Sequence, residues 1–190
     1  MKFGLLARFA LGAGVCCIPF PGLAQRRPAP PVNRLAPFVA SPQNVVEKML
    51  EAAGLKPGET LYDLGSGDGR VLITAAQRFG AKAVGIEISP REAKASTERI
   101  KTLKLDDKAS VIEGDLLTAD LSQADVVTIY LTTRSNDEIR PNLEKYLKPG
   151  ARVVSHDYEI RGWAPARVET VEAHKRAHHL YIYTMPPRKQ

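Results

Sequence analysis

From residue 41 onward, the hydrophobic positions of the chain follow two alternating patterns. Short, nearly continuous apolar runs predict buried strands, at residues 60–64, 83–88, 109–112, 125–131 and 152–155. In the intervening stretches apolar residues recur at helical spacing, which predicts helices over residues 42–53, 71–79, 90–103 and 135–147. Alternating strands and helices predict an α/β fold with a doubly wound, mostly parallel, Rossmann-like sheet.

The pattern changes near the C-terminus. Residues 168–171 and 179–184 are two strand-like runs with no helix of any length between them. Two such neighbours pair most simply as an antiparallel hairpin. We therefore expect a C-terminal antiparallel hairpin at one edge of the sheet.

Two helix starts carry residues typical of caps. Ser41 and Pro42 precede the first helix, where a serine cap and a proline in the first turn are both favoured. Ser135 and Glu138 have the spacing of a capping box, in which each side chain binds the backbone N–H of the other. These residues predict where the two helices begin.

The first residues resemble a targeting segment. Lys2 and Arg8 accompany an apolar run over residues 9–20, and small residues follow at 22–24. We expect residues 1–24 to be a signal peptide, 25–37 a disordered Pro/Arg-rich linker and 38–187 the folded domain. The apolar run is short and broken by proline, so we expect no transmembrane span in the mature chain. Export to the periplasm or medium is the expected localisation; a mitochondrial or cytoplasmic location is the alternative.

The net charge of +6 comes from the two ends of the chain and not from the expected domain. Seven of the basic residues lie before residue 35 or after residue 187, which leaves 20 basic and 21 acidic residues between them. A nucleic-acid-binding domain needs a basic face, so specific nucleic-acid binding is not expected. The only cysteines, Cys16 and Cys17, lie in the expected signal peptide. The mature chain would therefore have neither a thiolate metal site nor a thiol nucleophile.

A glycine-rich loop follows the first predicted strand, with the sequence Asp-Leu-Gly-Ser-Gly-Asp-Gly at residues 63–69. Open α/β sheets bind ligands at this end of their strands. The glycines run G-x-G-x-G, with Arg70 where the dinucleotide-binding fingerprint has its third glycine, and no phosphate-loop lysine follows. Asp63 would repel a pyrophosphate and suits a cationic ligand such as S-adenosylmethionine (SAM), which carries an ammonium and a sulfonium.

Two further acids follow the next two strands. Glu87 lies near the end of the second strand, where a carboxylate can accept both ribose hydroxyls of an adenosine. Asp115 follows the third strand and is placed to accept from the adenine amino group. The loop and the two acids together indicate SAM, which none of them would indicate alone.

With these features the chain resembles the seven-strand class I SAM-dependent methyltransferases over roughly residues 37–185. The resemblance implies that Asp63, Gly65, Ser66 and Gly67 line the methionine end of SAM. It implies that Glu87 holds the ribose and Asp115 the adenine. The expected terminal hairpin is also typical of this class.

The loop, together with residues 37–39 and Ser41, is similar to the small protein-lysine methyltransferases that modify the ATP synthase c-subunit and the adenine nucleotide translocase. Members of that family carry an aromatic-Val-Pro-[Ser/Thr] stretch over SAM, and here Ala40 replaces the proline. The resemblance places Phe38 and Ser41 beside the cofactor. It suggests a protein lysine as acceptor. The alternatives are a small-molecule methyltransferase, an exported SAM-binding module without catalysis, and a nicotinamide oxidoreductase, which the glycine spacing disfavours.

Candidate catalytic residues follow the fourth and fifth strands at the same sheet edge, where an acceptor amine must be aligned with the methyl group and lose its proton. They are Tyr130, Thr132, His156, Asp157 and Tyr158. We take Tyr130, Asp157 and Tyr158 as the catalytic candidates, with Asp157 or Tyr158 orienting the amine. Tyr130 as a packed strand aromatic, and His156-Asp157 as a simple strand end, are the alternatives.

Some chemistries are disfavoured. No N-P-P-Y tetrapeptide follows the fourth strand, which argues against methylation of planar amines in DNA or glutamine. Asp157 has no acidic partner after that strand, so a magnesium-dependent catechol-type site is not expected. His178 and His179 are adjacent in a predicted strand and must point to opposite faces, so only one can join a site, and no metal site is expected. Trp163 either flanks the acceptor channel or packs on the sheet edge.

Overall fold

The computed structural model of this protein describes Leu35 and residues 39–189. The predicted signal peptide, and the predicted linker apart from Leu35, lie outside the described residues. The helices are α1 (Gln43–Ala52), α2 (Arg70–Phe79), α3 (Pro90–Thr102) and α4 (Thr133–Tyr146). The strands are β1 (Thr60–Leu64), β2 (Lys82–Glu87), β3 (Ala109–Glu113), β4 (Val126–Ile129), β5 (Arg152–His156), β6 (Trp163–Ala164), β7 (Arg167–Ala173), β8 (Arg176–Thr184) and β9 (Arg188–Lys189).

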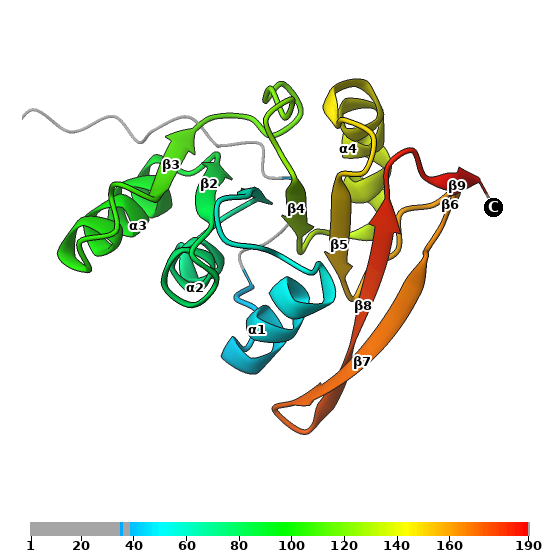
Figure 1. Cartoon of the computed structure of the whole chain (residues 1–190), viewed down its shortest axis with the longest axis horizontal. Coiled ribbons are helices and arrows are strands. Elements are labelled where there is room, and N and C mark those ends of the chain that lie inside the picture. Colours follow the sequence, from blue (N-terminus) through cyan, green and yellow to red (C-terminus); the bar gives the residue numbers. More distant parts are fainter. Residues whose placement is uncertain (1–34, 36–38, 190) are drawn as a thin grey trace, which may run out of the picture. The chain divides into compact units, whose positions relative to one another are not determined.

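Seven strands form one sheet in the order β3-β2-β1-β4-β5-β8-β7 (Figure 1). The first five in that order are parallel to one another, whereas β8 is antiparallel to β5 and β7 is antiparallel to β8. The structure thus confirms the doubly wound α/β fold and the C-terminal antiparallel hairpin. The hairpin strands are longer than predicted, since β8 begins at Arg176 rather than at His179.

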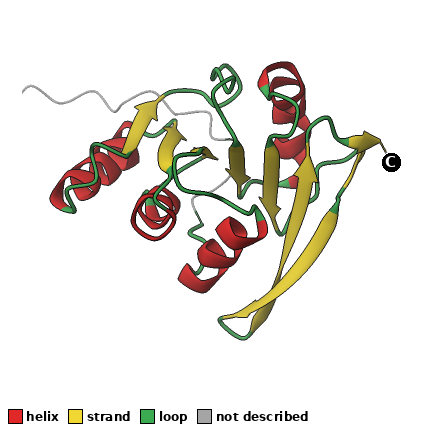
Figure 2. Ribbon diagram, viewed as in Figure 1, coloured by secondary structure: helices red, strands yellow, loops and turns green. Residues whose placement is uncertain are grey.

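Helices cover both faces of the sheet (Figure 2). One buried apolar cluster joins the sheet to α1, α2 and α3, and includes Val45, Leu50 and Leu72. A second cluster on the opposite face includes Ile139 and Leu143 of α4. Each such fully buried side chain contributes about 1.5–3 kcal/mol to folding, so the two clusters hold the carboxyl ends of the strands in fixed positions.

Among the described helices, none combines the length and the hydrophobicity that a membrane span requires.

Both predicted helix caps are wrong. Pro42, not Ser41, precedes the first residue of α1 and no side chain caps this helix, because the Ser41 hydroxyl lies against His156 instead. In α4 the cap is Thr132, whose Oγ1 accepts from the backbone N–H of Ser135 at 3.2 Å. Ser135 is therefore inside the helix, and its hydroxyl donates to the carbonyl of Leu35 at 2.5 Å.

A second, two-stranded sheet joins β6 to β9 near the C-terminus, and the sequence did not predict it. It holds Trp163, which is 2% exposed and packs edge-on against Tyr183. The indole N–H donates to Glu144 at 2.9 Å. Trp163 is therefore a core residue at the sheet edge, and its alternative role beside an acceptor channel is wrong.

Candidate active site

A cavity opens at the carboxyl ends of β1, β2 and β4, where the strand order reverses between β1 and β4. This is the position at which open α/β sheets bind their ligands. It is lined by Leu35, Val39, Ala40, Ser41, Met49, Asp63, Gly65, Ser66, Gly67, Asp68, Arg70, Val71, Glu87, Ile88, Glu92, Leu116, Tyr130 and Leu131. Six of the eight residues predicted to bind the cofactor are in this lining.

The glycine loop forms the floor of the cavity. Gly65, Gly67 and Gly69 all have positive φ angles, of 83°, 50° and 75°, which residues with a Cβ adopt only with strain. The backbone N–H groups of Gly65 and Ser66 donate to the carbonyl of Ile86 at 2.9 and 3.1 Å. The loop is thus pinned to the end of β2 before α2 begins.

Asp63 places a buried carboxylate beneath the loop. Asp63 is only 6% exposed, and Thr128 Oγ1 donates to its Oδ1 at 2.7 Å. The β1–β4 register sets Asp63 directly opposite Thr128, a contact that the sequence could not reveal. Burial raises the pKa of Asp63 to about 7; the Thr128 bond opposes this, and the charges of Glu87 and Asp68 add to it. The site is therefore ready to accept a positive charge.

Glu87 both supports the loop and faces the cavity. Its Oε2 accepts from the backbone N–H of Gly67 at 2.8 Å, and its Oε1 from that of Ser89 at 2.9 Å. A carboxylate has about four acceptor positions, so each oxygen keeps one for a ligand. Two hydroxyl groups can therefore be bound without disturbing the loop.

Ser66 lines the cavity but turns its hydroxyl into the protein. The hydroxyl is buried and has no hydrogen bond to any residue that the structure describes. It lies over Gly85 of β2 and near Leu72 of α2, because a Cβ at Gly85 would collide with both side chains, and neither Gly85 nor Leu72 lines the cavity. The side chain of Ser66 therefore packs the glycine loop against β2 and α2.

A short segment ahead of α1, residues 39–42, forms the side of the cavity and is called the strap here. Arg70 Nη1 donates to the carbonyl of Ser41 at 2.6 Å, while its Nη2 binds Asp68 Oδ2 at 2.7 Å. The guanidinium thus joins the strap to the glycine loop. This role of Arg70 was not predicted from the sequence.

The other two predicted cofactor residues lie elsewhere. Phe38 is outside the described residues. Asp115 is exposed and is not among the lining residues, although its neighbour Leu116 is. The Oδ1 of Asp115 accepts from the backbone N–H of Leu117 at 2.9 Å, so the side chain shapes the turn after β3.

Tyr130 lines the cavity directly after β4. Its ring stacks on His156 with centroids 3.8 Å apart, and its hydroxyl lies 3.5 Å from Asp157 Oδ2. Tyr130 therefore packs against His156 and also lines the cavity, and its catalytic role stays a prediction. Tyr158 is 39% exposed and its ring lies 6.4 Å from that of Tyr130, outside the cavity lining.

His156 and Asp157 do more than end a strand. His156 is fully buried, its Nδ1 is 2.9 Å from Ser41 Oγ and its Nε2 is 2.8 Å from His178 Nδ1. Burial lowers the pKa of His156 to about 4. Burial acts to raise the pKa of Asp157, but the hydrogen bond from the His179 backbone and nearby positive charges lower it below its usual range.

The two adjacent histidines of β8 behave as the strand pattern predicts. His178 is buried and joins His156, whereas His179 is exposed on the other face. The antiparallel pairing of β5 with β8 brings His178 beside Asp157, a contact between residues far apart in the sequence. The structure thus gathers His156, Asp157 and His178, although the sequence indicated only that His178 and His179 point to opposite faces.

A seven-stranded sheet that ends in an antiparallel hairpin, with an acid-glycine loop after β1 and an acid at the end of β2, defines a class I SAM-dependent methyltransferase. Within that class, the chain belongs to the ANTKMT methyltransferase domain family, whose family model matches residues 63–167. The enzyme class and the cofactor predicted from the sequence, SAM, are thereby confirmed.

Individual relatives agree with this assignment. The chain is 44% identical over 154 residues to a protein-lysine N-methyltransferase of Saccharolobus islandicus, covering 80% of this chain and 96% of that protein. It is 30% identical to the human lysine N-methyltransferase of the ATP synthase c-subunit and to the mouse lysine N-methyltransferase of the adenine nucleotide translocase, over 70% and 73% of this chain. The matches span only 56% and 60% of those two mammalian proteins.

A solved structure is also similar. It is described as an RNA methyltransferase from Salinibacter ruber in complex with S-adenosyl-L-homocysteine, with 43% identity and a TM-score of 0.74. The match covers 80% of this chain and 97% of that one. The relatives therefore agree on methyl transfer and carry names with different acceptors.

Proposed function

We propose that the protein transfers the methyl group of SAM to the ε-amino group of a lysine in another protein. The observation that carries this proposal is the 44% identity to a protein-lysine N-methyltransferase over nearly the whole of that relative. The human and mouse relatives named above are also lysine methyltransferases. Tyr130 lines the cavity and would lie at its acceptor end.

Five residues are proposed to hold the cofactor. The buried carboxylate of Asp63 would bind the ammonium of SAM, because an opposite charge stabilises an ionised group that burial penalises. The two free acceptor positions of Glu87 would bind the ribose hydroxyls. Ser66 would line the methionine end as part of the glycine loop, and Asp115, with Phe38, would lie at the adenine end.

When bound, SAM supplies an electrophilic methyl carbon with a neutral thioether as its leaving group. The lysine nitrogen attacks with its lone pair as the carbon–sulfur bond breaks, so the amine must reach the site unprotonated or lose its proton there. The protein's contribution is alignment and the exclusion of water. Tyr130 is proposed to contact the amine, since it lines the cavity.

Asp157 is proposed to act through Tyr130. Its carboxylate lies 3.5 Å from the Tyr130 hydroxyl and is paired with Arg176, so it is not a free base. Asp157 would therefore orient the hydroxyl, and the proton of the amine would leave to water. Tyr158, more than a third exposed beside Tyr130, would contact the polypeptide that carries the lysine.

RNA is the second candidate acceptor, because the solved structure with 43% identity is described as an RNA methyltransferase. The charge of the domain counts against it. Residues 35–187 carry 20 basic and 21 acidic residues, whereas RNA-binding domains concentrate positive charge on a face. An exported binding module and a small-molecule methyltransferase are not favoured by any of the relatives described above.

The test is transfer of radiolabelled methyl groups from SAM into a fractionated cell extract. We expect the label to resist ribonuclease, to be released by protease, and to appear as ε-N-methyllysine after acid hydrolysis. A chain carrying Asp63→Ala serves as the control and should transfer no label. Label that ribonuclease releases would establish RNA as the acceptor and overturn the proposal.

A further inference from the structure

Beside the cofactor cavity, three side chains direct a metal-ligating atom to one point. They are His156 Nε2, His178 Nδ1 and Asp157 Oδ2, and together they are called the His-His-Asp cluster. His156 and Asp157 come from the end of β5, and His178 comes from β8. The proposed methyl-transfer mechanism uses only the carboxylate of Asp157, through Tyr130, and leaves both imidazoles without a role.

The spacing of the three atoms is that of ligands around one metal ion. The two imidazole nitrogens are 2.8 Å apart, His178 Nδ1 lies 3.2 Å from Asp157 Oδ2, and His156 Nε2 lies 3.4 Å from it. Ligands bound tetrahedrally to zinc, with bonds of about 2.0–2.1 Å, are separated by about 3.3 Å. An ion bound to all three atoms would therefore require only tenths of an ångström of movement.

The other polar atoms of these side chains are held in place. His156 Nδ1 is 2.9 Å from Ser41 Oγ, and Asp157 Oδ1 accepts from the backbone N–H of His179 at 3.0 Å. Metal-binding histidines and carboxylates almost always have such outer partners, which fix the ring and the carboxylate in the binding orientation. The cluster is thus pre-organised on two strands and is not a chance meeting of flexible side chains.

The cluster also attracts a cation. Neutral imidazoles carry one N–H each, so either two of the three atoms meet lone pair to lone pair, which a positive group between them relieves, or the two facing nitrogens meet N–H to N–H. In the structure Arg176 supplies that group, with its Nη2 against Asp157 Oδ2 and 3.2 Å from His178 Nδ1. Its side chain is 56% exposed, so it can leave with little loss of buried contact.

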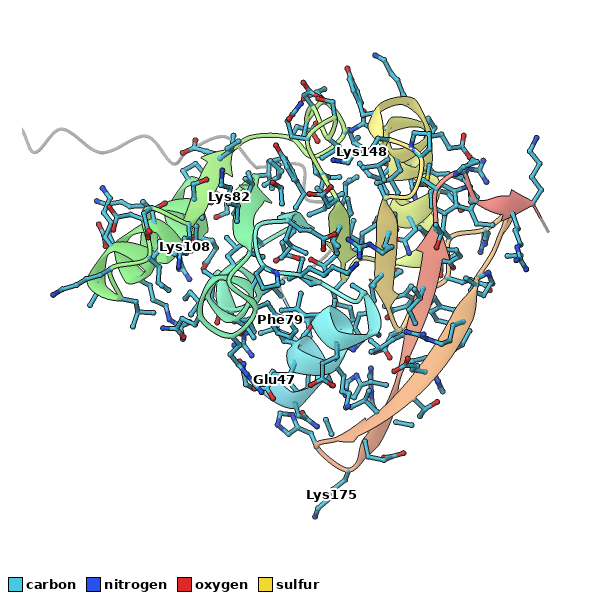
Figure 3. The ribbon with its side chains drawn as sticks, viewed as in Figure 1. Glu47, Phe79, Lys82, Lys108, Lys148 and Lys175 are labelled. Carbon is cyan, nitrogen blue, oxygen red and sulfur yellow. The ribbon has the colours of Figure 1, made fainter. Side chains whose placement is uncertain are left out.

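The position of Arg176 in the fold also allows its side chain to turn toward solvent. It is the first residue of β8, next to the hairpin turn whose Lys175 points away from the body of the domain (Figure 3). A divalent ion that displaced the guanidinium would gain two imidazoles and a carboxylate, while Arg176 would turn to solvent.

We propose that His156, Asp157 and His178 form a binding site for a divalent first-row transition metal, of which zinc is the best match. Two imidazoles and one carboxylate suit zinc or iron, whereas magnesium and calcium prefer sites made of oxygen ligands. Three protein ligands leave a coordination position open, as in sites that bind water or a substrate atom. The site adjoins Tyr130, and therefore lies at the acceptor end of the cavity.

The test measures Zn²⁺ binding directly and does not depend on methyl transfer. The protein is the full chain with Cys16→Ser and Cys17→Ser, which removes its only thiols. Isothermal titration calorimetry should give one Zn²⁺ per chain, with no heat from Mg²⁺. Co²⁺ used in place of Zn²⁺ should give visible absorption typical of four- or five-coordinate nitrogen and oxygen ligation.

Three variants decide the outcome. His178→Ala and Asp157→Asn should each weaken Zn²⁺ binding about tenfold or more, and asparagine tolerates the left-handed backbone of residue 157. Arg176→Ala should strengthen binding, because it removes the competing cation; this gain cannot arise from misfolding. The matched control is His179→Ala, the exposed neighbour, which should bind as the parent does. Equal Zn²⁺ affinity in the parent and His178→Ala, or no gain in Arg176→Ala, would overturn the proposal.

Discussion

At the scale of single residues, the charge of Asp63 has the largest expected effect on stability. Its carboxyl titrates near 3.8 in an unfolded chain and near 7 in the folded protein without ligand. Between these pH values the folded state holds a proton that the unfolded state has lost, so stability falls as the pH rises from about 4 to about 7. The expected loss at full ionisation is roughly 4 kcal/mol.

Urea unfolding of the ligand-free protein at pH 5 and pH 8 checks this prediction. Asp63→Asn should be more stable than the parent at both pH values, and by a larger margin at pH 8 than at pH 5, since the amide carries no charge to bury. The prediction would be contradicted if the difference in unfolding free energy between the parent and Asp63→Asn were the same at pH 5 and at pH 8.

The same carboxylate makes SAM binding depend on pH. A bound ammonium favours the ionised form of Asp63, so we expect the affinity for SAM to rise between pH 6 and pH 8, by about tenfold for each unit by which binding lowers the pKa. Calorimetric titration with SAM across this range measures the effect. At pH 8, Asp63→Asn should bind SAM more weakly than the parent does. Its affinity for SAM should also change less with pH than that of the parent, because the contribution of this one carboxyl is missing.

Tyr130 is the residue on which the proposed acceptor chemistry depends most. Tyr130→Phe keeps the ring stacked on His156 and removes the hydroxyl that lies near Asp157. We expect kcat to fall by about tenfold to a hundredfold while KM for SAM is unchanged, because the proposed lost contact is to the amine and not to the cofactor. Steady-state transfer to a labelled protein fraction measures both constants. Tyr146→Phe, in α4 and outside the cavity lining, is the control and should retain kcat.

At the scale of elements, Gly85 couples strand β2 to the glycine loop. A Cβ at this position would lie 2.6 Å from Ser66 Cβ and 2.7 Å from Leu72 Cδ1. Gly85→Ala should destabilise the protein by about 1–3 kcal/mol and also weaken SAM binding, because Ser66 must move. Gly114→Ala meets nothing within 4 Å and should do neither. Thermal unfolding with and without SAM separates the two effects.

The elements themselves were predictable where the signal is local. The apolar runs located the strands of the parallel sheet, and the missing helix near the C-terminus revealed the β7–β8 hairpin. The caps of α1 and α4 were not predictable, because tertiary contacts occupy the serine hydroxyls that the sequence offers there, whereas Ser89, before Pro90, does cap α3. Ser41 binds toward His156 and Ser135 toward Leu35, which leaves Pro42 and Thr132 at the cap positions.

The same division applies to the site. The sequence located Asp63, the glycine loop and Glu87, because each directly ends a strand or follows one, and strand ends share an edge. Thr128 beneath Asp63 and His178 beside Asp157 depend on strand register, which only the folded sheet specifies. Arg70 was visible as a departure from the dinucleotide fingerprint, but nothing in the sequence indicated its contact with Ser41.

At the scale of the whole molecule, the location of the enzyme follows from residues outside the described structure. We propose that residues 1–24 direct export and are then removed, on the basis of their basic start, apolar run and small residues. Mass spectrometry of the chain recovered from the producing cells should find Gln25 as the first residue. Recovery of the chain with residues 1–24 intact in the cytoplasmic fraction would contradict the proposal.

Arg70, which joins the strap to the glycine loop, has a consequence for turnover. The strap and the glycine loop both line the cofactor cavity, and one guanidinium holds them together through a carboxylate and a carbonyl partner. Both side chains of the Arg70–Asp68 pair are about 30% exposed, so dissolved salt can weaken it. Where exchange of spent for fresh cofactor is the slow step, moderate ionic strength should therefore quicken the enzyme rather than inhibit it.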